Sequence, residues 1–426
     1  MVENFSWTPE GPLPSIREHT KCKLDVFRQY LDIYFDTLTQ RFGMDRLDVN
    51  LVDGFCGGGA YQDDENVLSG SPLILLKAVE DAETRINAKR TKPFTINASY
   101  YFVDAQVHHI TRLKSILRDT GYLPKLEGQI TFVNGDFESH LPKMVKDIKE
   151  KPRVGKSIFL LDQFGYSDVK AASLNSIFDN FSGAEVLLTF GVDGLLNYLH
   201  ENKINQTVYR EFDIKEDFIK KWRERHGSGL TRPLAQRYIM NNLHKAVRAA
   251  FMTPFMLHSH GDNREMALIH LSNHQAARNK MLEVYWSKKN KFFHCGKGST
   301  YTMGFDEELL ETGGTLFNFD EVAHKQMVHE LQNDLPPRIH ALIKDGSLPI
   351  SDLLNEIGNY TAAPNKVMLG VVSSFVSDGD FSILSQDGKA RRVSTIPTIN
   401  DRIILPPQKS FSFGSTSKKP NNSERF

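Results

Sequence analysis

Residues Leu47–Gly59 read LDVNLVDGFCGGG. The first half is an apolar run that predicts a buried β-strand ending at Asp53. The second half predicts a turn whose backbone comes close to a ligand, because glycine has no Cβ in the way. Backbone N–H groups in such a turn can face an adenosyl, carboxylate or phosphate group. We therefore expect a nucleotide-binding α/β domain to begin here, with a cofactor contacting Asp53, Gly54, Gly57 and Gly59.

Three later strand-like runs also end on polar residues: Tyr100–Asp104 (YYFVD), Ile130–Asp136 (ITFVNGD) and Ile158–Tyr166 (IFLLDQFGY). Asp104 lies where α/β nucleotide folds hold ribose hydroxyls, since a carboxylate offers only acceptors to a diol. Its alternative role is the N-cap of the next helix. Asp136 is predicted either to accept from an adenine amino group or to form an Asx-type turn.

Asp162-Gln163-Phe164-Gly165-Tyr166 is the candidate for chemistry. At the end of a buried strand, Asp162 can accept a hydrogen bond from an amine or take its proton, while Phe164 or Tyr166 stacks on a planar base. This order resembles the Asp-Pro-Pro-Tyr element of amino methyltransferases. Gln163 departs from it, because proline stiffens that loop. The alternative is a purely structural turn.

Strand-like and helix-like runs alternate from Leu47 to Trp286, which predicts a doubly wound, mostly parallel sheet of seven strands. An amphipathic helix is expected before it, over Lys23–Phe42. About ten residues separate the glycine turn from the next helix, which begins at Ser71-Pro72. This spacing disfavours a dinucleotide oxidoreductase, whose fingerprint glycines open the helix directly. Long, charged segments over Asn205–Met252 predict an inserted helical lobe.

The C-terminal part predicts a winged helix. Helices over Asp352–Ile357 and Asn365–Ser374 are followed by strands Phe381–Leu384 and Arg391–Val393 around an Asp-Gly turn. A set of basic residues in this module is suited to contact the backbone phosphates of nucleic acid. An equally open interpretation is a protein-docking module with solvated charges. The basic residues are Lys366, Lys389, Arg391 and Arg392.

The composition of the chain argues against several classes of protein. The 52 Lys and Arg residues balance 52 Asp and Glu residues, so net charge neither demands nor excludes a nucleic-acid partner. Three separated cysteines predict reduced thiols with no disulfide framework, and the histidine and cysteine spacing predicts no metal site. No run predicts a membrane span or signal peptide. We expect a cytoplasmic protein.

Several segments together resemble the three-Cys-motif partner (TcmP) proteins, a bacterial family with typical elements D-x-F-A-G-x-G, G-S-P-L, N-G-D/E-F and D-P-F-G-x. The stretch Glu265–Trp286 and the C-terminal module also look like that family. The motifs here are VDGFCGGGAY (Val52–Tyr61), GSPLILLKAV (Gly70–Val79), YYFVDA (Tyr100–Ala105), VNGDF (Val133–Phe137) and FLLDQFGYSDV (Phe159–Val169).

The resemblance implies a methyltransferase-like Rossmann domain, a role in nucleic-acid modification or mobile-element defence, and a neighbouring partner with a three-cysteine motif similar to radical S-adenosylmethionine enzymes. Two departures bear on activity. Cys56-Gly57-Gly58 replaces the usual Ala-Gly-Pro, and Gln163 replaces the proline of D-P-F-G.

The leading hypothesis is an S-adenosylmethionine-binding, methyltransferase-like enzyme acting on DNA, RNA or a partner-delivered substrate. The alternative is a non-catalytic nucleic-acid or protein adaptor on the same fold. The predicted parts are an N-terminal helical segment (1–46), a Rossmann methyltransferase-like domain (47–290) with the insertion (205–252), a winged-helix-like domain (320–407) and a disordered tail (408–426).

Overall fold

The computed structural model describes residues 6–40, 43–200, 211, 213–224, 232–259, 264–288, 293–294, 301–306 and 316–406. The predicted tail, Phe42 at the end of the first predicted helix and parts of the predicted insertion lie outside these residues. Clustering of contacts divides the chain into a large unit (1–334 and 354–367) and a C-terminal unit (335–353 and 368–426). This division differs from the predicted boundary at 320.

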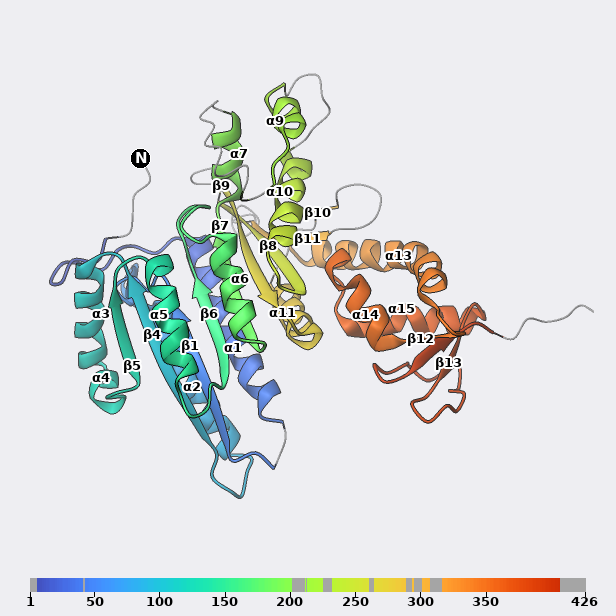
Figure 1. Cartoon of the computed structure of the whole chain (residues 1–426), viewed down its shortest axis with the longest axis horizontal. Coiled ribbons are helices and arrows are strands. Elements are labelled where there is room, and N and C mark those ends of the chain that lie inside the picture. The colour runs from blue at the N-terminus through green and yellow to red at the C-terminus, as the bar shows by residue number, and fades with distance from the viewer. Residues whose placement is uncertain are drawn as a thin grey trace, which may run out of the picture. The chain divides into compact units, whose positions relative to one another are not determined.

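Within the described residues of the large unit, nine strands form one sheet in the order β10-β11-β8-β9-β7-β6-β1-β4-β5 (Figure 1). Neighbours from β5 to β7 pair in parallel, and β9 pairs antiparallel with both β7 and β8. The strands are β1 Arg46–Asp53, β4 Thr95–Asp104, β5 Ile130–Asn134, β6 Lys156–Leu161, β7 Ala184–Phe190, β8 Phe251–Ser259, β9 Arg264–Ser272, β10 Phe293–His294 and β11 Tyr301–Asp306.

The seven strands from β8 to β5 confirm the predicted α/β class with a mostly parallel sheet. Two strands at the edge, β10 and β11, were not predicted. β10 has only two residues, and β11 reads YTMGFD, with a glycine and no sustained alternation. Short strands of this kind lack the period-2 pattern on which sequence prediction depends.

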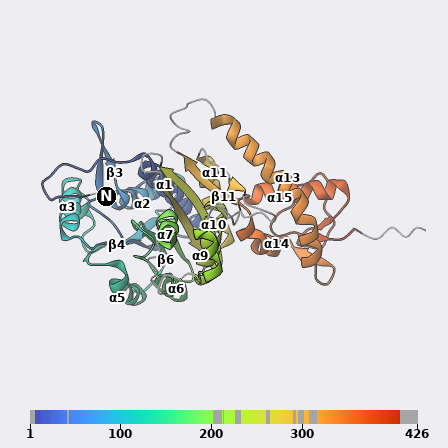
Figure 2. The same ribbon diagram turned by 90° about the horizontal axis from the view of Figure 1, so that it is seen from above.

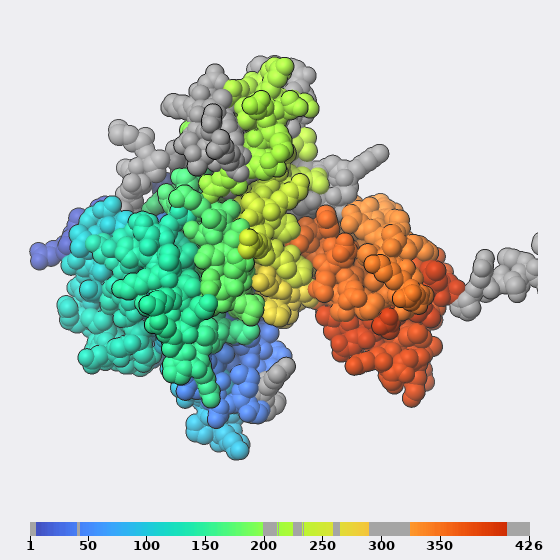
Figure 3. Space-filling view, viewed as in Figure 1, coloured from blue at the N-terminus to red at the C-terminus, as the bar shows by residue number. Residues whose placement is uncertain are grey.

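Helices cover both faces of the sheet, which makes it doubly wound. Helices α1 and α2 lie on one face, and α5 and α6 lie on the other (Figure 2). In the space-filling view α5 and α6 form the surface of that second face (Figure 3). The helices of the large unit before the insertion are α1 Glu18–Leu38, α2 Ser71–Asn87, α3 Val107–Asp119, α4 Tyr122–Lys125, α5 Phe137–Lys149 and α6 Ala171–Asn180.

Burial on both faces explains the apolar character of the central strands. In β1 the residues Val49–Asp53 are all buried, and in β6 the residues Ser157–Leu161 are all buried. A strand covered by helices on both sides reads as a continuous apolar run rather than an alternation. The polar residues that follow such strands therefore gather at one edge of the sheet.

The ten residues between the glycine turn and α2 form a hairpin, β2 (Ala60–Asp63) with β3 (Asn66–Ser69). At its base, the Gly70 N–H donates to the Gly59 carbonyl at 2.8 Å. The hairpin therefore projects away while α2 still begins beside the glycine turn. The hairpin thus accounts for the long sequence separation between the glycine turn and α2, and the two remain adjacent in space.

We predict that Gly70→Ala destabilises the large unit by about 1–3 kcal/mol, because an added Cβ would lie 2.9 Å from the Gly59 carbonyl oxygen, a backbone atom with little freedom to move. The control is Gly370→Ala, where a Cβ meets nothing within 4 Å inside a helix. That control is expected to raise stability by about 0.5–1 kcal/mol. Urea unfolding measures both. Equal effects would contradict the close packing at the hairpin base.

Between β7 and β8 the described residues include α7 (Val192–His200), α9 (Glu216–Arg223) and α10 (Arg232–Ala246). Helices α9 and α10 lie within the predicted insertion (205–252), α7 precedes it, and its last two residues belong to β8. Trp222 is buried, and its indole N–H donates to the Leu196 carbonyl at 2.9 Å. Phe218 and Tyr238 stack with ring centroids 4.0 Å apart. Apolar anchors therefore hold the insertion to the rest of the large unit.

Residues Thr361–Asn365 belong to the large unit because α11 (Gln275–Ser287) holds their backbone. The buried Arg278 donates to the Ala363 carbonyl at 3.2 Å, and the Trp286 indole N–H donates to the Ala362 carbonyl at 2.9 Å. A buried guanidinium needs acceptors in place of water, and these carbonyls supply them. This explains why the contact boundary cuts through the C-terminal helices.

The C-terminal unit contains a three-stranded antiparallel sheet, in the order β12-β14-β13. The predicted strand Arg391–Val393 is wrong. Only a bridge between Leu384 and Ala390 forms there, the chain then turns, and β14 pairs with β13 instead. The winged-helix assignment stays a prediction. The elements from residue 316 onward, of which α13, α14 and α15 are divided between the two units, are α13 Leu316–Leu342, β12 Ser347–Pro349, α14 Ile350–Ile357, α15 Asn365–Asp378, β13 Ser382–Leu384 and β14 Arg402–Ile404.

Candidate functional site at the carboxyl edge of the sheet

Strand β1 has β4 on one side and β6 on the other, so the order of strands along the chain reverses between β1 and β6. Ligands of open α/β sheets bind outside the carboxyl ends of the strands at such a reversal. The glycine turn follows β1, and the loop that begins at Asp162 follows β6. The Gly54 N–H donates to the Leu160 carbonyl at 2.8 Å. The structure thus brings together the two segments that the sequence marked.

Asp53 is the most deeply buried polar group of this edge, with no exposed surface. One carboxyl oxygen accepts from the Phe55 N–H at 3.3 Å, and the other has no hydrogen-bond partner among the described residues. Burial raises the pKa of Asp53 to about 7, with the charges of Asp162 and Asp104 acting in the same direction and the Ser71 hydroxyl against it. This carboxyl group is therefore poised to ionise when a cation or donor arrives.

We predict that Asp53 makes stability depend on pH. Its pKa is near 3.8 when unfolded and about 7 when folded, so its contribution is fully present below pH 3.8 and is lost as pH rises to about 7. The loss reaches about 4 kcal/mol. Asp53→Asn should flatten this part of the profile measured by urea unfolding from pH 4.5 to 8. An unchanged profile would show that the Asp53 pKa is not raised.

Asp104 holds the glycine turn rather than facing an open space. Its Oδ2 accepts from the Gly57 N–H at 3.0 Å, and its Oδ1 accepts from the Gln106 N–H at 2.8 Å and lies 2.9 Å from Nδ1 of His109. Two backbone N–H groups and the His109 ring thus lie within hydrogen-bond distance of the Asp104 carboxylate, and a ribose contact by Asp104 stays a prediction. Gln106 is the N-cap of α3, so the alternative role predicted for Asp104 is wrong.

Trp7 packs against the glycine turn. A Cβ added to Gly58 would lie 2.2 Å from the Trp7 ring system, and one added to Gly57 would lie 2.9 Å from it. The Trp7 indole N–H donates to the Ala60 carbonyl at 2.6 Å. Gly57 also has a φ of +57°. The turn therefore needs glycine both for its left-handed backbone and for the indole. Sequence reasoning missed Trp7, which lies in a polar segment with no periodic pattern.

Asp162 forms an ion pair with Lys23 of α1, with Nζ at 2.6 Å from each carboxylate oxygen. Lys23 is buried, and the carboxylate of Asp162 keeps partial access to solvent. Lys23 was not among the predicted site residues. The available signal was its position, since Lys23 precedes Phe27 and Tyr30 on the apolar face of the predicted helix. A lysine on such a face needs a buried partner.

Gln163 stiffens the loop after β6 by a different means from proline. Its side-chain oxygen accepts from the backbone N–H groups of Asp168 and Val169, both at 3.0 Å. Gln163 therefore ties this loop together by hydrogen bonds, and its effect on the positioning of a target amine stays a prediction. Its Nε2 atom is buried without a partner in the described part of the chain. Two buried polar atoms of this edge, on Asp53 and Gln163, thus lack hydrogen-bond partners among the described residues.

The remaining predicted residues have mixed placements. Phe164 exposes 62% of its surface, whereas Tyr166 is partly buried, with its ring 6.1 Å from that of Tyr198. Asp136 is the N-cap of α5 and accepts from the Ser139 N–H at 2.8 Å, a hydrogen bond that lowers its pKa. Asp136 therefore caps α5, while the predicted Asx-type turn and the adenine contact both stay predictions.

The predicted phosphate-binding residues divide into two groups. Arg391 forms an ion pair with the buried Asp401, with 2.7 Å between Nε and Oδ2, and its Nη2 donates a hydrogen bond to Oδ1 at 2.8 Å. Asp401 in turn accepts from the Thr398 N–H at 2.7 Å. Arg391 therefore holds the C-terminal unit together. Lys389 and Arg392 are exposed in that unit, and Lys366 is exposed in the large unit.

We predict that Arg391→Ala destabilises the C-terminal unit by about 3 kcal/mol, because it leaves the buried Asp401 carboxylate unpaired. The matched control Arg392→Ala changes stability by less than about 0.5 kcal/mol, as expected for an exposed residue. Urea unfolding followed by circular dichroism compares them. A neutral Arg391→Ala would return this arginine to the set of candidate phosphate ligands.

Among the described residues, no group of three or more His, Cys, Asp and Glu side chains is arranged to hold a metal ion. The described helices include none whose length and apolar content would let it cross a membrane. The described cysteines, Cys22 and Cys56, are both buried, and neither forms a disulfide bond within the described part of the chain.

No protein-family model and no curated protein matches the chain. Solved structures to which it is similar include methyltransferases. The bifunctional kinase-methyltransferase WbdD matches at 12% identity over 61% of this chain and 40% of its own, with a TM-score of 0.30. An S-adenosylmethionine-dependent methyltransferase from Agrobacterium tumefaciens matches at 11% identity over 61% and 64%, also at 0.30.

A third similar structure is the O-methyltransferase TomG from Streptomyces achromogenes in complex with S-adenosylmethionine. It matches at 11% identity over 64% of this chain and 100% of its own, with a TM-score of 0.29. The match to WbdD spans less than half of that protein's length. The fold assignment above depends on the strand order of this chain, and no argument is drawn from similarities of this size.

Proposed function

We propose that this protein binds S-adenosylmethionine at the reversal between β1 and β6 and transfers its methyl group to a nucleophile held by Asp162. The observation that carries this proposal is the pair of buried, unpartnered polar atoms on Asp53 and Gln163 beside the Lys23–Asp162 ion pair. Polar atoms left unpaired in a protein interior cost free energy unless a ligand satisfies them.

The donor set fits a cation with hydrogen-bonding groups. When bound, S-adenosylmethionine supplies an electrophilic methyl group on a positively charged sulfur. Asp53 is a buried acid whose ionised form a nearby cation would favour, and the Gln163 Nε2 group offers a hydrogen-bond donor. Asp104 is committed to the glycine turn, so this proposal does not assign it to the ribose. The glycine turn and Asp53 form the binding wall.

Asp162 would position and activate the nucleophile. Its carboxylate keeps partial solvent access while Lys23 fixes its orientation from the buried side. A carboxylate held in this way can accept a hydrogen bond from an amine or hydroxyl and stabilise the positive charge that develops on it. The exposed ring of Phe164 lies two residues away in the same loop and offers a surface for a planar base.

We predict that calorimetric titration of the full chain shows saturable binding of S-adenosylmethionine. Asp53→Asn should weaken it by about 1.5–3 kcal/mol, because the mutation removes a charged hydrogen-bond partner. Affinity of the unmutated protein should rise between pH 6 and pH 8, since Asp53 ionises near pH 7 and its anion favours a cation. The control Asp179→Asn changes an exposed ion pair on α6. Absence of binding would refute the cofactor assignment.

Catalysis requires a separate readout. Asp162→Asn should leave cofactor affinity nearly unchanged but abolish transfer of a labelled methyl group to DNA, RNA or the three-cysteine-motif partner, because this residue acts on the transition state. Asp162→Asn leaves the buried Lys23 charge without a partner, which lowers stability. The double variant Lys23→Met/Asp162→Asn removes both charges and is assayed beside the single variant. Transfer that survives in both variants would place the active centre elsewhere.

A second candidate function is a non-catalytic adaptor, and one observation favours it. Trp7 packs on the glycine turn, and three protein donors occupy Asp104, so residues of the chain itself occupy much of the predicted cofactor wall. An adaptor would show no cofactor binding, and Asp162→Asn would leave partner binding intact. The two candidates are thus separated by the titration above.

The substrate and partner belong to the proposal through the family resemblance. The role that the resemblance implies is nucleic-acid modification or mobile-element defence, and the partner it implies is a three-cysteine-motif protein similar to radical S-adenosylmethionine enzymes. The proposed location is the cytoplasm, where thiols such as Cys22 and Cys56 stay reduced. The exposed Lys389 and Arg392 are the phosphate-contacting candidates that the structure leaves accessible in the C-terminal unit.

A further inference from the structure

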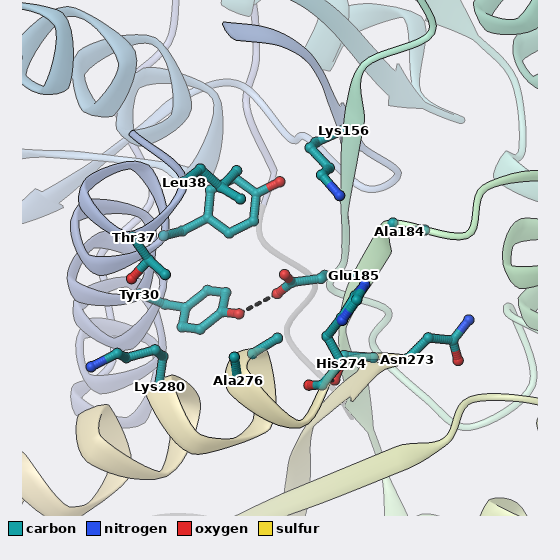
Figure 4. A pocket seen from close by; sticks show the side chains of 14 residues that line it. Tyr30, Thr37, Leu38, Lys156, Ala184, Glu185, Asn273, His274, Ala276 and Lys280 are labelled. Carbon is teal, nitrogen blue, oxygen red and sulfur yellow. Dashed lines mark hydrogen bonds between the residues drawn. The ribbon is translucent and has the colours of Figure 1, made fainter. Parts of the chain in front are cut away.

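A cavity of about 200 Å³ lies in the large unit near the amino ends of β6 and β7, away from the glycine turn. One wall is α1, with Tyr30, Tyr34 and Leu38. Strands β6 and β7 contribute Lys156 and Glu185, and the first turn of α11 closes the remaining side (Figure 4). None of these residues belongs to the proposed methyl-transfer site.

Glu185 is already satisfied by groups of the protein. Its carboxylate accepts a hydrogen bond from the Tyr30 hydroxyl, drawn as a dashed line in Figure 4, and lies 3.0 Å from Nε2 of the fully buried His270. Burial, and secondly the charge of Glu185, raises the pKa of Tyr30, so the tyrosine stays protonated as a donor. Glu185 therefore organises the wall of the cavity and is a poor partner for a ligand.

Two other groups of the lining lack partners. The Tyr34 hydroxyl is buried without a hydrogen bond in the described structure, on a residue that is only 5% exposed. Lys156 has no carboxylate within ion-pair distance of its ammonium group among the described residues. By contrast Lys280, at the rim, pairs with Glu283 at 2.8 Å. The cavity thus offers one free cation and one free hydroxyl.

We propose that this cavity binds a small organic carboxylate that carries a flat apolar ring. The carboxylate would meet the Lys156 ammonium and the Tyr34 hydroxyl, both of which can donate hydrogen bonds. The ring would lie against the tyrosine rings, Leu38 and the alanines of the lining. The volume equals that of roughly seven water molecules in the liquid, which limits the ligand to a single ring with a short substituent.

The proposal does not depend on methyl transfer. Helix α1 borders both regions, but Lys23 and Tyr34 are eleven residues apart, which corresponds to about 16 Å along a helix. Loss of S-adenosylmethionine binding would leave this cavity unchanged. Conversely, filling the cavity tests the carboxylate site without altering any residue assigned to the cofactor.

The test is a ligand-observed NMR titration of the full chain with benzoate as the probe. We expect a dissociation constant on the order of 1 mM, as is usual for a ligand of nine non-hydrogen atoms. Benzyl alcohol and benzylamine carry the same ring without the negative charge and should bind at least tenfold more weakly. Equal binding of the three, or no binding of benzoate, would overturn the proposal.

Three variants locate the site. Lys156→Met should weaken benzoate binding at least tenfold, and Tyr34→Phe about fivefold. Ala277→Phe should abolish binding by filling the cavity from α11. The control Lys143→Met removes an exposed lysine from α5 and should change nothing. Thermal melting confirms that each variant is folded. Benzoate binding that is equally strong in Lys156→Met and Ala277→Phe would place the ligand elsewhere and refute the proposal.

Discussion

The ion pair between Lys23 and Asp162 is the interaction on which the arrangement of this domain depends. It joins α1, which precedes the sheet in the chain, to the loop after β6 at the centre of the sheet. A buried ammonium group is tolerated only with a counter-charge, so the pair determines where the N-terminal half of α1 lies. The same helix then brings Tyr30 and Tyr34 to the amino ends of β6 and β7.

Charge is distributed unevenly at the carboxyl edge. The charges of Asp104 and Asp162 help to raise the pKa of Asp53, and each carboxyl group has different surroundings. Asp162 has a lysine, Asp104 has two backbone N–H groups and the His109 ring, and Asp53 has the Phe55 N–H and the Ser71 hydroxyl. These three carboxyl groups all follow or end a strand of the sheet, and yet they have different roles. The least satisfied of them is the one that a cationic ligand would stabilise most.

Much of the fold could be predicted because its signals are local. Apolar runs that end on acidic or glycine-bearing residues identified four of the seven strands, and the alternation of strand-like and helix-like runs identified the other three. Ser71-Pro72 identified the start of α2. The glycine turn was found because its φ of +57° at Gly57 requires glycine. The strand expected at Arg391–Val393 failed because pairing with β14 depends on residues some ten positions further along the chain.

The sequence by itself determined the class of the fold, the strand ends that meet at one edge and the identity of Asp53 and Asp162 as candidates, because hydrophobic periodicity and turn chemistry act over short distances. Only the tertiary structure decided what those residues contact. Trp7 reaches the glycine turn across some fifty positions, and Lys23 reaches Asp162 across 139. Such contacts are selected by burial and charge compensation within the packed domain, which no local pattern records.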